Sequence, residues 1–136
     1  MTKILLVEDS KFLRIATERA LTRAGYEMSS AVDGEEALLL AREKLPYLIL
    51  LDMLLPKMSG PDVLLALKKD PLTKAIPVVV VTGMSQKNAA QLKKDGAVGF
   101  LEKADLALEG GSEKLLKAVQ EILQKIVSEP SRRTTT

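Results

Sequence analysis

Apolar residues are grouped along the chain in runs whose lengths distinguish strands from helices. Three runs are almost wholly apolar and too short for helices, which is typical of strands buried on both faces of a parallel sheet. They are 3–7 (KILLV), 47–52 (YLILLD) and 77–82 (PVVVVT). Two weaker runs, 26–31 (YEMSSA) and 98–103 (VGFLEK), complete a set of five predicted strands.

The segments between these runs carry apolar residues at helical spacing and have recognisable helix ends. Segment 10–25 ends in Gly25, which can take the left-handed conformation that often terminates a helix. Segment 33–45 begins with Asp33 and has Glu36 three positions later, the pattern of a capping box. Strands that alternate with helices imply a parallel sheet with helices packed on both faces. Helices are predicted at 10–25, 33–45, 60–70, 85–96 and 112–126.

Polar residues stand at the points where the predicted strands end. Asp52 is an acid at the end of an apolar run, and burial of a strand alone does not explain an acid at this position. The carboxyl ends of parallel strands lie at one edge of the sheet, where such folds bind ligands, so we expect these residues to converge there. The expected group consists of Glu8 and Asp9 after the first strand, Asp52, Thr82 at the end of the 77–82 run, and Lys103.

The chemistry of this group suits a phosphoryl group. Three carboxylates held close together repel one another and need a cation between them. Oxygen ligands favour a hard divalent ion, so Mg²⁺ is the expected cofactor and Mn²⁺ the alternative. Lys103 and Thr82 would stabilise phosphoryl oxygens, and Asp52 is the natural nucleophile that would form an acyl phosphate.

Composition narrows the chemistry further. The chain has no cysteine and no histidine, which excludes disulfides, thiolate chemistry, a histidine triad and a phosphohistidine of its own. The net charge of +2 comes from 20 basic and 18 acidic residues spread along the chain, so we expect no nucleic-acid partner. Residues 1–7 lack the apolar region of a secretory signal, and no apolar run approaches ~20 residues. We therefore expect no membrane association and a cytoplasmic location.

Taken in order, the motifs at the strand ends resemble those of the response-regulator receiver domains of two-component signalling. The resemblance covers about residues 2–126. Each motif alone is weak, but the set in this order and spacing is highly specific. The motifs are the Glu8-Asp9 pair, DMLLPKMSG at 52–60, VVVVTG at 78–83 and FLEK at 100–103.

The resemblance implies a flavodoxin-like α/β fold. This is a doubly wound sheet of five parallel strands in the order 2-1-3-4-5, with five helices. Residues 1–127 would form a single receiver domain, and 128–136 would be a flexible C-terminal tail. The implied function is a phosphorelay switch that accepts a phosphoryl group from a histidine kinase or phosphotransfer protein and then changes its binding to a downstream target protein.

The resemblance also assigns roles to single residues. Asp52 would be the phosphoacceptor, and Asp9, Asp52 and the backbone carbonyl of Leu54 would bind Mg²⁺ directly, with Glu8 acting through water. This site would make the protein a phosphoprotein that phosphorylates and slowly dephosphorylates itself, and not a turnover enzyme.

Further roles fall on the last two strands. Thr82 and Lys103 would hold the phosphoryl oxygens. Phe100 would be the switch aromatic, which turns inward when Thr82 is drawn toward the phosphate.

Three features depart from the family pattern. Ala104 stands where a proline usually follows the site lysine, and the segment 104–112 is a few residues longer than usual. Leu54 and Met84, two positions after Asp52 and Thr82, are apolar and cannot orient an attacking water by hydrogen bonding. We therefore expect slow self-dephosphorylation.

One alternative function stays open. A receiver-like interaction module could bind partners without ever being phosphorylated. The complete set of carboxylates, threonine and lysine favours phosphorylation. A flavodoxin-type cofactor site is disfavoured because Glu8 and Asp9 would repel the phosphate of the cofactor, and an aspartyl phosphohydrolase would need an acid at the position of Leu54.

Overall fold

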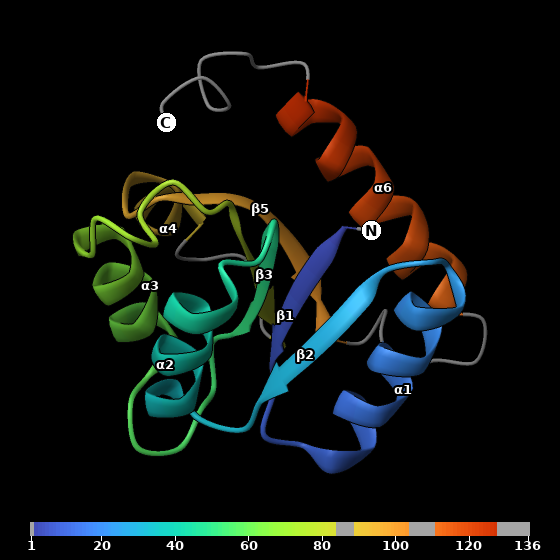
Figure 1. Ribbon diagram of the computed structural model, residues 1–136, viewed down its shortest axis with the longest axis horizontal. Coiled ribbons are helices and arrows are strands. Elements are labelled where there is room, and N and C mark those ends of the chain that lie inside the picture. Colours follow the sequence, from blue (N-terminus) through green and yellow to red (C-terminus); the bar gives the residue numbers. More distant parts are fainter. Residues whose placement is uncertain (1, 84–88, 104–110, 128–136) are drawn as a thin grey trace.

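A computed structural model describes residues 2–83, 89–103 and 111–127. Figure 1 shows a central twisted sheet with helices on both sides. Met84, Ala104 and the predicted tail 128–136 lie outside the described residues, so the predictions made for them stay predictions.

The sheet has five strands in the order β2-β1-β3-β4-β5, and every neighbouring pair is parallel. This confirms the predicted doubly wound fold and strand order. Tyr47 and Pro77, which were predicted inside strands, come just before them, and Lys103 comes just after the last strand. The strands are β1 (Lys3–Val7), β2 (Glu27–Ala31), β3 (Leu48–Asp52), β4 (Val78–Thr82) and β5 (Ala97–Glu102).

Helices cover both faces of the sheet. In Figure 1, α1 and α6 lie on one side, and α2, α3 and α4 lie on the other. None of the helices in the described part of the chain has the length and apolar composition that a membrane span requires. The helices are α1 (Lys11–Arg23), α2 (Gly34–Lys44), α3 (Gly60–Lys69), α4 (Ala89–Lys94) and α6 (Gly111–Val127).

Side-chain caps start three of these helices at the carboxyl edge of the sheet. The side chains of Ser10, Asp33 and Ser59 accept backbone N–H groups in the first turns of α1, α2 and α3. Asp33 Oδ1 accepts the Glu36 N–H at 2.9 Å, while Glu36 Oε1 accepts the Val32 N–H at 3.0 Å, close to the predicted capping box. The predicted helices 10–25 and 33–45 are shorter in the structure because their end residues serve as caps.

The core consists of two apolar layers, one on each face of the sheet. Alternate residues of β1 enter different layers: Leu5 and Val7 pack toward α2 and α3, whereas Ile4 and Leu6 pack toward α1 and α6. Each fully buried leucine, isoleucine or valine stabilises the fold by about 1.5–3 kcal/mol. Burial on both faces explains why the central strands are uninterrupted apolar runs, and why their first polar residues appear only at the edge.

Candidate functional site

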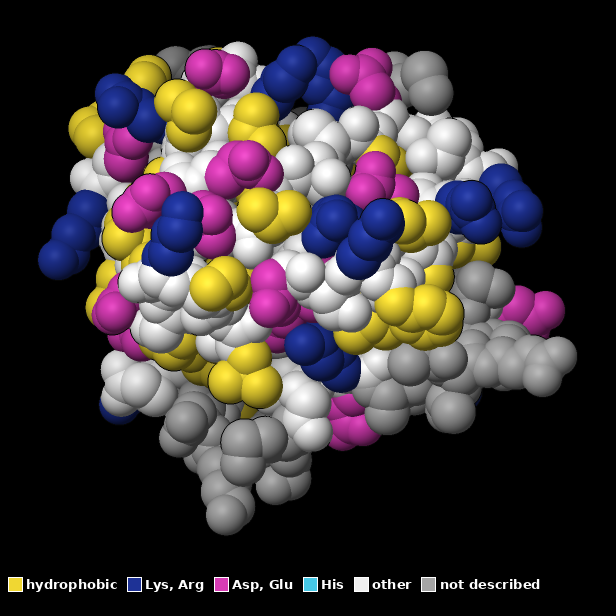
Figure 2. Space-filling view, turned by 90° about the horizontal axis from the view of Figure 1, so that it is seen from below, with side chains coloured by type: hydrophobic (Ala, Val, Ile, Leu, Met, Phe, Trp, Pro, Cys, Tyr) yellow, Lys and Arg dark blue, Asp and Glu magenta, His cyan; other side chains and the backbone are white. Residues whose placement is uncertain are grey.

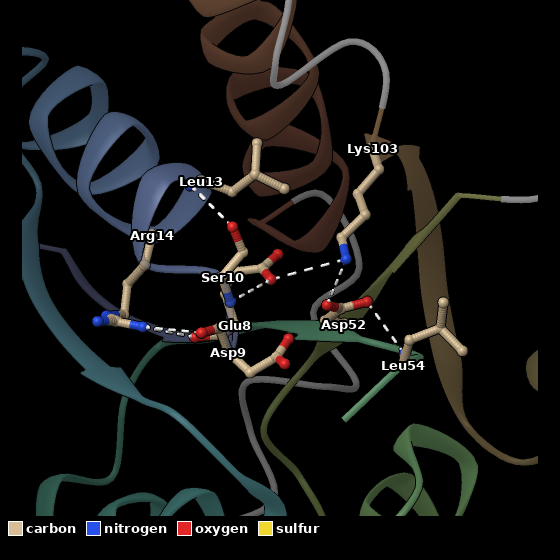
Figure 3. Close-up of polar contacts among 8 residues, drawn as sticks. All are labelled: Glu8, Asp9, Ser10, Leu13, Arg14, Asp52, Leu54 and Lys103. Carbon is tan, nitrogen blue, oxygen red and sulfur yellow. Dashed lines mark hydrogen bonds and ion pairs between the residues drawn. The ribbon is translucent and has the colours of Figure 1, made fainter. Parts of the chain in front are cut away.

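Three carboxylates meet at the carboxyl edge of the sheet. Glu8 and Asp9 follow β1, and Asp52 is the last residue of β3. One oxygen from each of the three lies within 4.8 Å of the others (Figure 3). Glu8 is 2% exposed and Asp52 is 1% exposed, whereas Asp9 lies at the surface. The structure therefore forms an acidic cluster with two buried members and one exposed member.

Lys103 brings a positive charge to this cluster from the end of β5. Its Nζ lies 2.8 Å from Asp52 Oδ2 and 3.6 Å from Glu8 Oε2. Burial of Lys103 favours the neutral amine, but the contact with Asp52 and the charge of Glu8 outweigh it, so the pKa of Lys103 is raised above 10.5. The lysine is thus a stable cation beside Asp52.

Asp52 keeps unused acceptor capacity. Its Oδ1 accepts the N–H of Leu54 at 3.1 Å. Its Oδ2 is buried and, among the described residues, forms an ion pair with Lys103 but accepts no further hydrogen bond. A carboxylate oxygen has room for more than one partner, so a metal ion could share Asp52 with Lys103.

Glu8 is held in an unfavourable charged environment. Burial is the main reason that its pKa is raised from 4.5 to about 7. The N–H of Ser10, 3.0 Å from Glu8 Oε2, and the charge of Lys103 act in the opposite direction, whereas the negative charge of Asp52 adds to the rise. A further cation would relieve the repulsion between the two acids.

The donor set fits a hard divalent ion. All three candidate ligand side chains are carboxylates, and magnesium prefers oxygen ligands together with water. The exposed position of Asp9 would leave room for water molecules on the ion. Leu54, the fourth predicted ligand, is tied to Asp52 through its N–H.

Thr82 and Phe100 come from the two strands beyond Asp52. Thr82 is half-buried at the end of β4, opposite Glu102 in the register of β5. Phe100 is half-buried, stands opposite Val80, and packs against the core layer on the side of α2 and α3. Thr82 thus lies beside Glu102, the residue before Lys103. Phe100 lies two positions before Glu102 on β5. Their roles in switching stay predictions.

The chain that follows Asp52 is pressed against the start of α3. A Cβ atom on Gly60 would lie 2.4 Å from Met53 Cα and 2.7 Å from the Asp52 carbonyl oxygen. The Gly60 N–H also donates to the Met53 carbonyl at 3.2 Å. Only glycine permits this approach, which holds the backbone of Asp52 in a defined position.

Arg14 is a contact of the site that the sequence analysis did not single out. Its Nη1 donates to the backbone carbonyl of Glu8 at 3.1 Å and lies 3.4 Å from that of Asp9 (Figure 3). Helical spacing places Arg14 in the first turn after the acids, within reach of the loop. The sequence does not say, however, that the guanidinium turns back toward backbone oxygens.

The face around the site is mixed in character. Figure 2 views the molecule from below the sheet of Figure 1, toward the ends of the strands, and shows acidic, basic and hydrophobic side chains side by side. Apolar residues in the segments after β1, β2 and β3 are exposed: Phe12 by 71%, Val32 by 38% and Leu54 by 65%. The segments that follow these three strands therefore expose apolar side chains as well as charge.

Comparison with known proteins gives consistent matches. The family model described as the response regulator receiver domain matches residues 4–124. The response regulator PleD of Caulobacter vibrioides is 41% identical over 102 residues, which cover 74% of this chain and 22% of PleD. The chain thus spans about a fifth of the length of that relative.

Solved structures with a similar fold cover nearly the whole chain. The chemotaxis response regulator CheY4 of Vibrio cholerae has a TM-score of 0.80 and 32% identity, over 90% of this chain and 98% of CheY4. A CheY-like receiver domain protein from Methanospirillum hungatei has a TM-score of 0.82 and 27% identity, over 95% of this chain and 98% of that protein.

Proposed function

Because the chain belongs to the family of response regulator receiver domains, we propose that it is a switch controlled by phosphorylation of Asp52. One observation carries the proposal: a buried aspartate forms a 2.8 Å ion pair with a lysine ammonium and lies within 4.8 Å of two further carboxylates. This arrangement supports attack by Asp52 and stabilisation of the charge that is transferred.

In the proposed reaction, a carboxylate oxygen of Asp52 attacks the phosphorus of a phosphohistidine on a partner protein. The new O–P bond gives an acyl phosphate, and the P–N bond breaks with its electrons moving to the imidazole, which takes up a proton. Lys103 would hold phosphoryl oxygens, and the position of its ammonium beside Asp52 supports this role. The hydroxyl of Thr82, at the end of the adjacent strand, is the proposed second donor.

Mg²⁺ is the proposed cofactor. When bound, it would offset the charge of the carboxylates and of the phosphoryl oxygens. Asp9, Asp52 and the Leu54 carbonyl would hold it directly, and Glu8 would hold it through water. The geometry that supports this set is the meeting of the three carboxylates at one point of the sheet edge.

The proposed output is a change in partner binding. Phosphorylation adds roughly two negative charges at Asp52, which would draw the Thr82 hydroxyl toward the site. Phe100, half-buried on the next strand, would then repack and alter the surface that a target protein contacts. The protein would return to its first state by slow self-dephosphorylation, so it would act as a switch and not as a turnover enzyme.

A phosphodonor protein is the proposed upstream partner. Membership of the receiver family suggests a histidine kinase or a phosphotransfer protein, and the absence of histidine from this chain agrees with it. The exposed side chains of Phe12, early in α1, and of Leu54, two residues after Asp52, are the proposed apolar contacts with it. Since kinases of this kind draw on ATP, the proposal includes a cytoplasmic location.

Mass spectrometry after incubation with acetyl phosphate and Mg²⁺ tests the proposal. The wild-type chain should gain one phosphoryl group, and Asp52→Asn should gain none. Asp62→Asn, which alters an exposed acid on α3, is the matched control and should react like the wild type. If Asp52→Asn is phosphorylated, another residue is the phosphoacceptor. If no chain reacts, and beryllofluoride with Mg²⁺ leaves the NMR signals of Thr82 and Phe100 unchanged, the unphosphorylated interaction module becomes the better reading.

A further inference from the structure

We propose that Arg14 is a positioning residue of the acidic site, because it fixes the turn that lets Glu8 and Asp9 point their carboxylates at the same place. The inference rests on the proposed function, in which these acids hold Mg²⁺. It concerns the contact of one guanidinium nitrogen with two consecutive backbone carbonyls, 3.1 Å from Glu8 O and 3.4 Å from Asp9 O.

The position of the two acids in the chain makes a turn necessary. In an extended strand, consecutive side chains point to opposite faces of the sheet. The Glu8 N–H still pairs with the Ala31 carbonyl at 3.0 Å, so strand-like pairing continues as far as Glu8. Yet an oxygen of Glu8 and one of Asp9 both lie within 4.8 Å of Asp52 and of each other. The chain must therefore turn between Glu8 and Asp9.

Arg14 bridges this turn. Consecutive carbonyls of an extended strand also point in opposite directions, so two of them meet one nitrogen only where the chain has turned. On the other side of the loop, the Ser10 N–H donates to the Glu8 carboxylate at 3.0 Å, and Ser10 caps α1, the helix that carries Arg14 (Figure 3). The loop is thus held by Arg14 through its carbonyls and by Ser10 through a carboxylate.

A positioning role and a purely electrostatic role predict opposite results. Arg14 is positively charged and lies near the acids, so its charge alone would repel a cation. If charge were its whole effect, removing it would tighten Mg²⁺ binding. If Arg14 fixes the turn, removing it lets the acids separate, and Mg²⁺ binding weakens. The expected loss is about tenfold, the lower end of the range for groups that orient metal ligands, because Arg14 acts through the backbone.

Calorimetric titration with Mg²⁺ distinguishes these roles. Four metal-free chains are compared: wild type, Arg14→Met, Arg14→Lys and Arg19→Met. The Arg19 variant is the matched control, because it removes the same charge from an exposed position of the same helix. Thermal unfolding in EDTA verifies the fold of each chain. Hydrogen exchange of the Ser10 amide, measured without metal, reports on the loop itself.

Support requires three results together. Arg14→Met binds Mg²⁺ about tenfold more weakly than the wild type, Arg14→Lys recovers part of the loss because its ammonium can still donate, and Arg19→Met stays close to the wild type or binds more tightly. The Ser10 amide should exchange faster in Arg14→Met at an unchanged unfolding temperature. If Arg14→Met does not fold, Arg14→Lys is used in its place. Support then requires that folded Arg14→Lys binds Mg²⁺ more weakly than the wild type.

Equal or tighter binding by folded Arg14→Met, or by folded Arg14→Lys where Arg14→Met does not fold, overturns the positioning role and leaves the proposed function intact. An equal loss in Arg19→Met also overturns it, since the effect would then not depend on contact with the loop. If the wild type itself binds no Mg²⁺, the proposed metal site fails, and the inference fails with it. If the wild type binds Mg²⁺ and only the comparison of variants fails, the inference alone is overturned.

Discussion

Glu8 should make the metal-free fold less stable as the pH rises. It is 2% exposed, and its burial, with the added charge of Asp52, raises its pKa from 4.5 to about 7. In the unfolded chain the group ionises at its ordinary value. The folded chain therefore binds this proton more tightly than the unfolded chain. The contribution of Glu8 to stability is largest below pH 4.5 and declines as the pH rises, and its full loss is reached above pH 7.

The difference between the two pKa values sets the size of the effect. At about 1.4 kcal/mol per pKa unit, the free energy of unfolding falls by about 3 kcal/mol, which lowers Tm by roughly 10 °C for a chain of this length. Two other shifted groups lie outside this pH window. Asp33, whose pKa is lowered chiefly by the N–H of Glu36, loses its contribution only below pH 3.8, and Lys103 titrates above pH 10.5.

Thermal unfolding in EDTA at pH 4 to 8 tests this expectation. Circular dichroism is the suitable probe, because the chain has no tryptophan. Glu8→Gln keeps an acceptor for the Ser10 N–H but does not titrate. It should come closest to the wild type near pH 4 and unfold roughly 10 °C higher at pH 8. Glu35→Gln, at an exposed position of α2, should follow the wild-type curve. Parallel curves for wild type and Glu8→Gln would refute the reasoning.

Two further predictions follow from the loop after Asp52. Gly60→Ala should cost about 1–3 kcal/mol in urea unfolding, because its Cβ would meet backbone atoms of Met53 and Asp52, whereas a Cβ on Gly83 would lie 3.9 Å from the nearest side chain. Similar losses for Gly60→Ala and Gly83→Ala would contradict this account. Leu54→Asn should shorten the lifetime of the phosphorylated protein, because an amide can orient water where leucine cannot. An unchanged or longer lifetime would count against the predicted role of Leu54.

The fold could be predicted from the sequence where burial leaves a simple pattern. The three central strands, β1, β3 and β4, are covered on both faces, so they read as apolar runs. Their ends were less certain, since Tyr47 continues the apolar run of β3 without lying in the strand. Leu45 was predicted inside a helix but caps α2 with a φ of 45°. This left-handed conformation is uncommon for leucine, so the sequence does not indicate it. The strand order came from the family resemblance, because the pattern alone does not order strands.

The site could be predicted as far as strand topology determines it. Parallel strands end at one edge, and this places Glu8, Asp9, Asp52 and Lys103 in one region without any knowledge of side-chain geometry. The contact of Arg14 with backbone carbonyls could not be predicted, because it depends on how the loop after β1 turns. The roles assigned to these residues rest on chemistry and resemblance, and the phosphorylation and Mg²⁺ experiments decide them.

The pairing of Lys103 with Asp52 also has a consequence for synthesis of the protein. The acids arise from the first half of the sequence, whereas the amine that neutralises them belongs to the end of the final strand. On a growing chain, β1, β2 and β3 are therefore translated well before Lys103, the ion-pair partner of Asp52. No shorter N-terminal piece contains both partners, so a finished site marks a chain that has been made at least as far as Lys103.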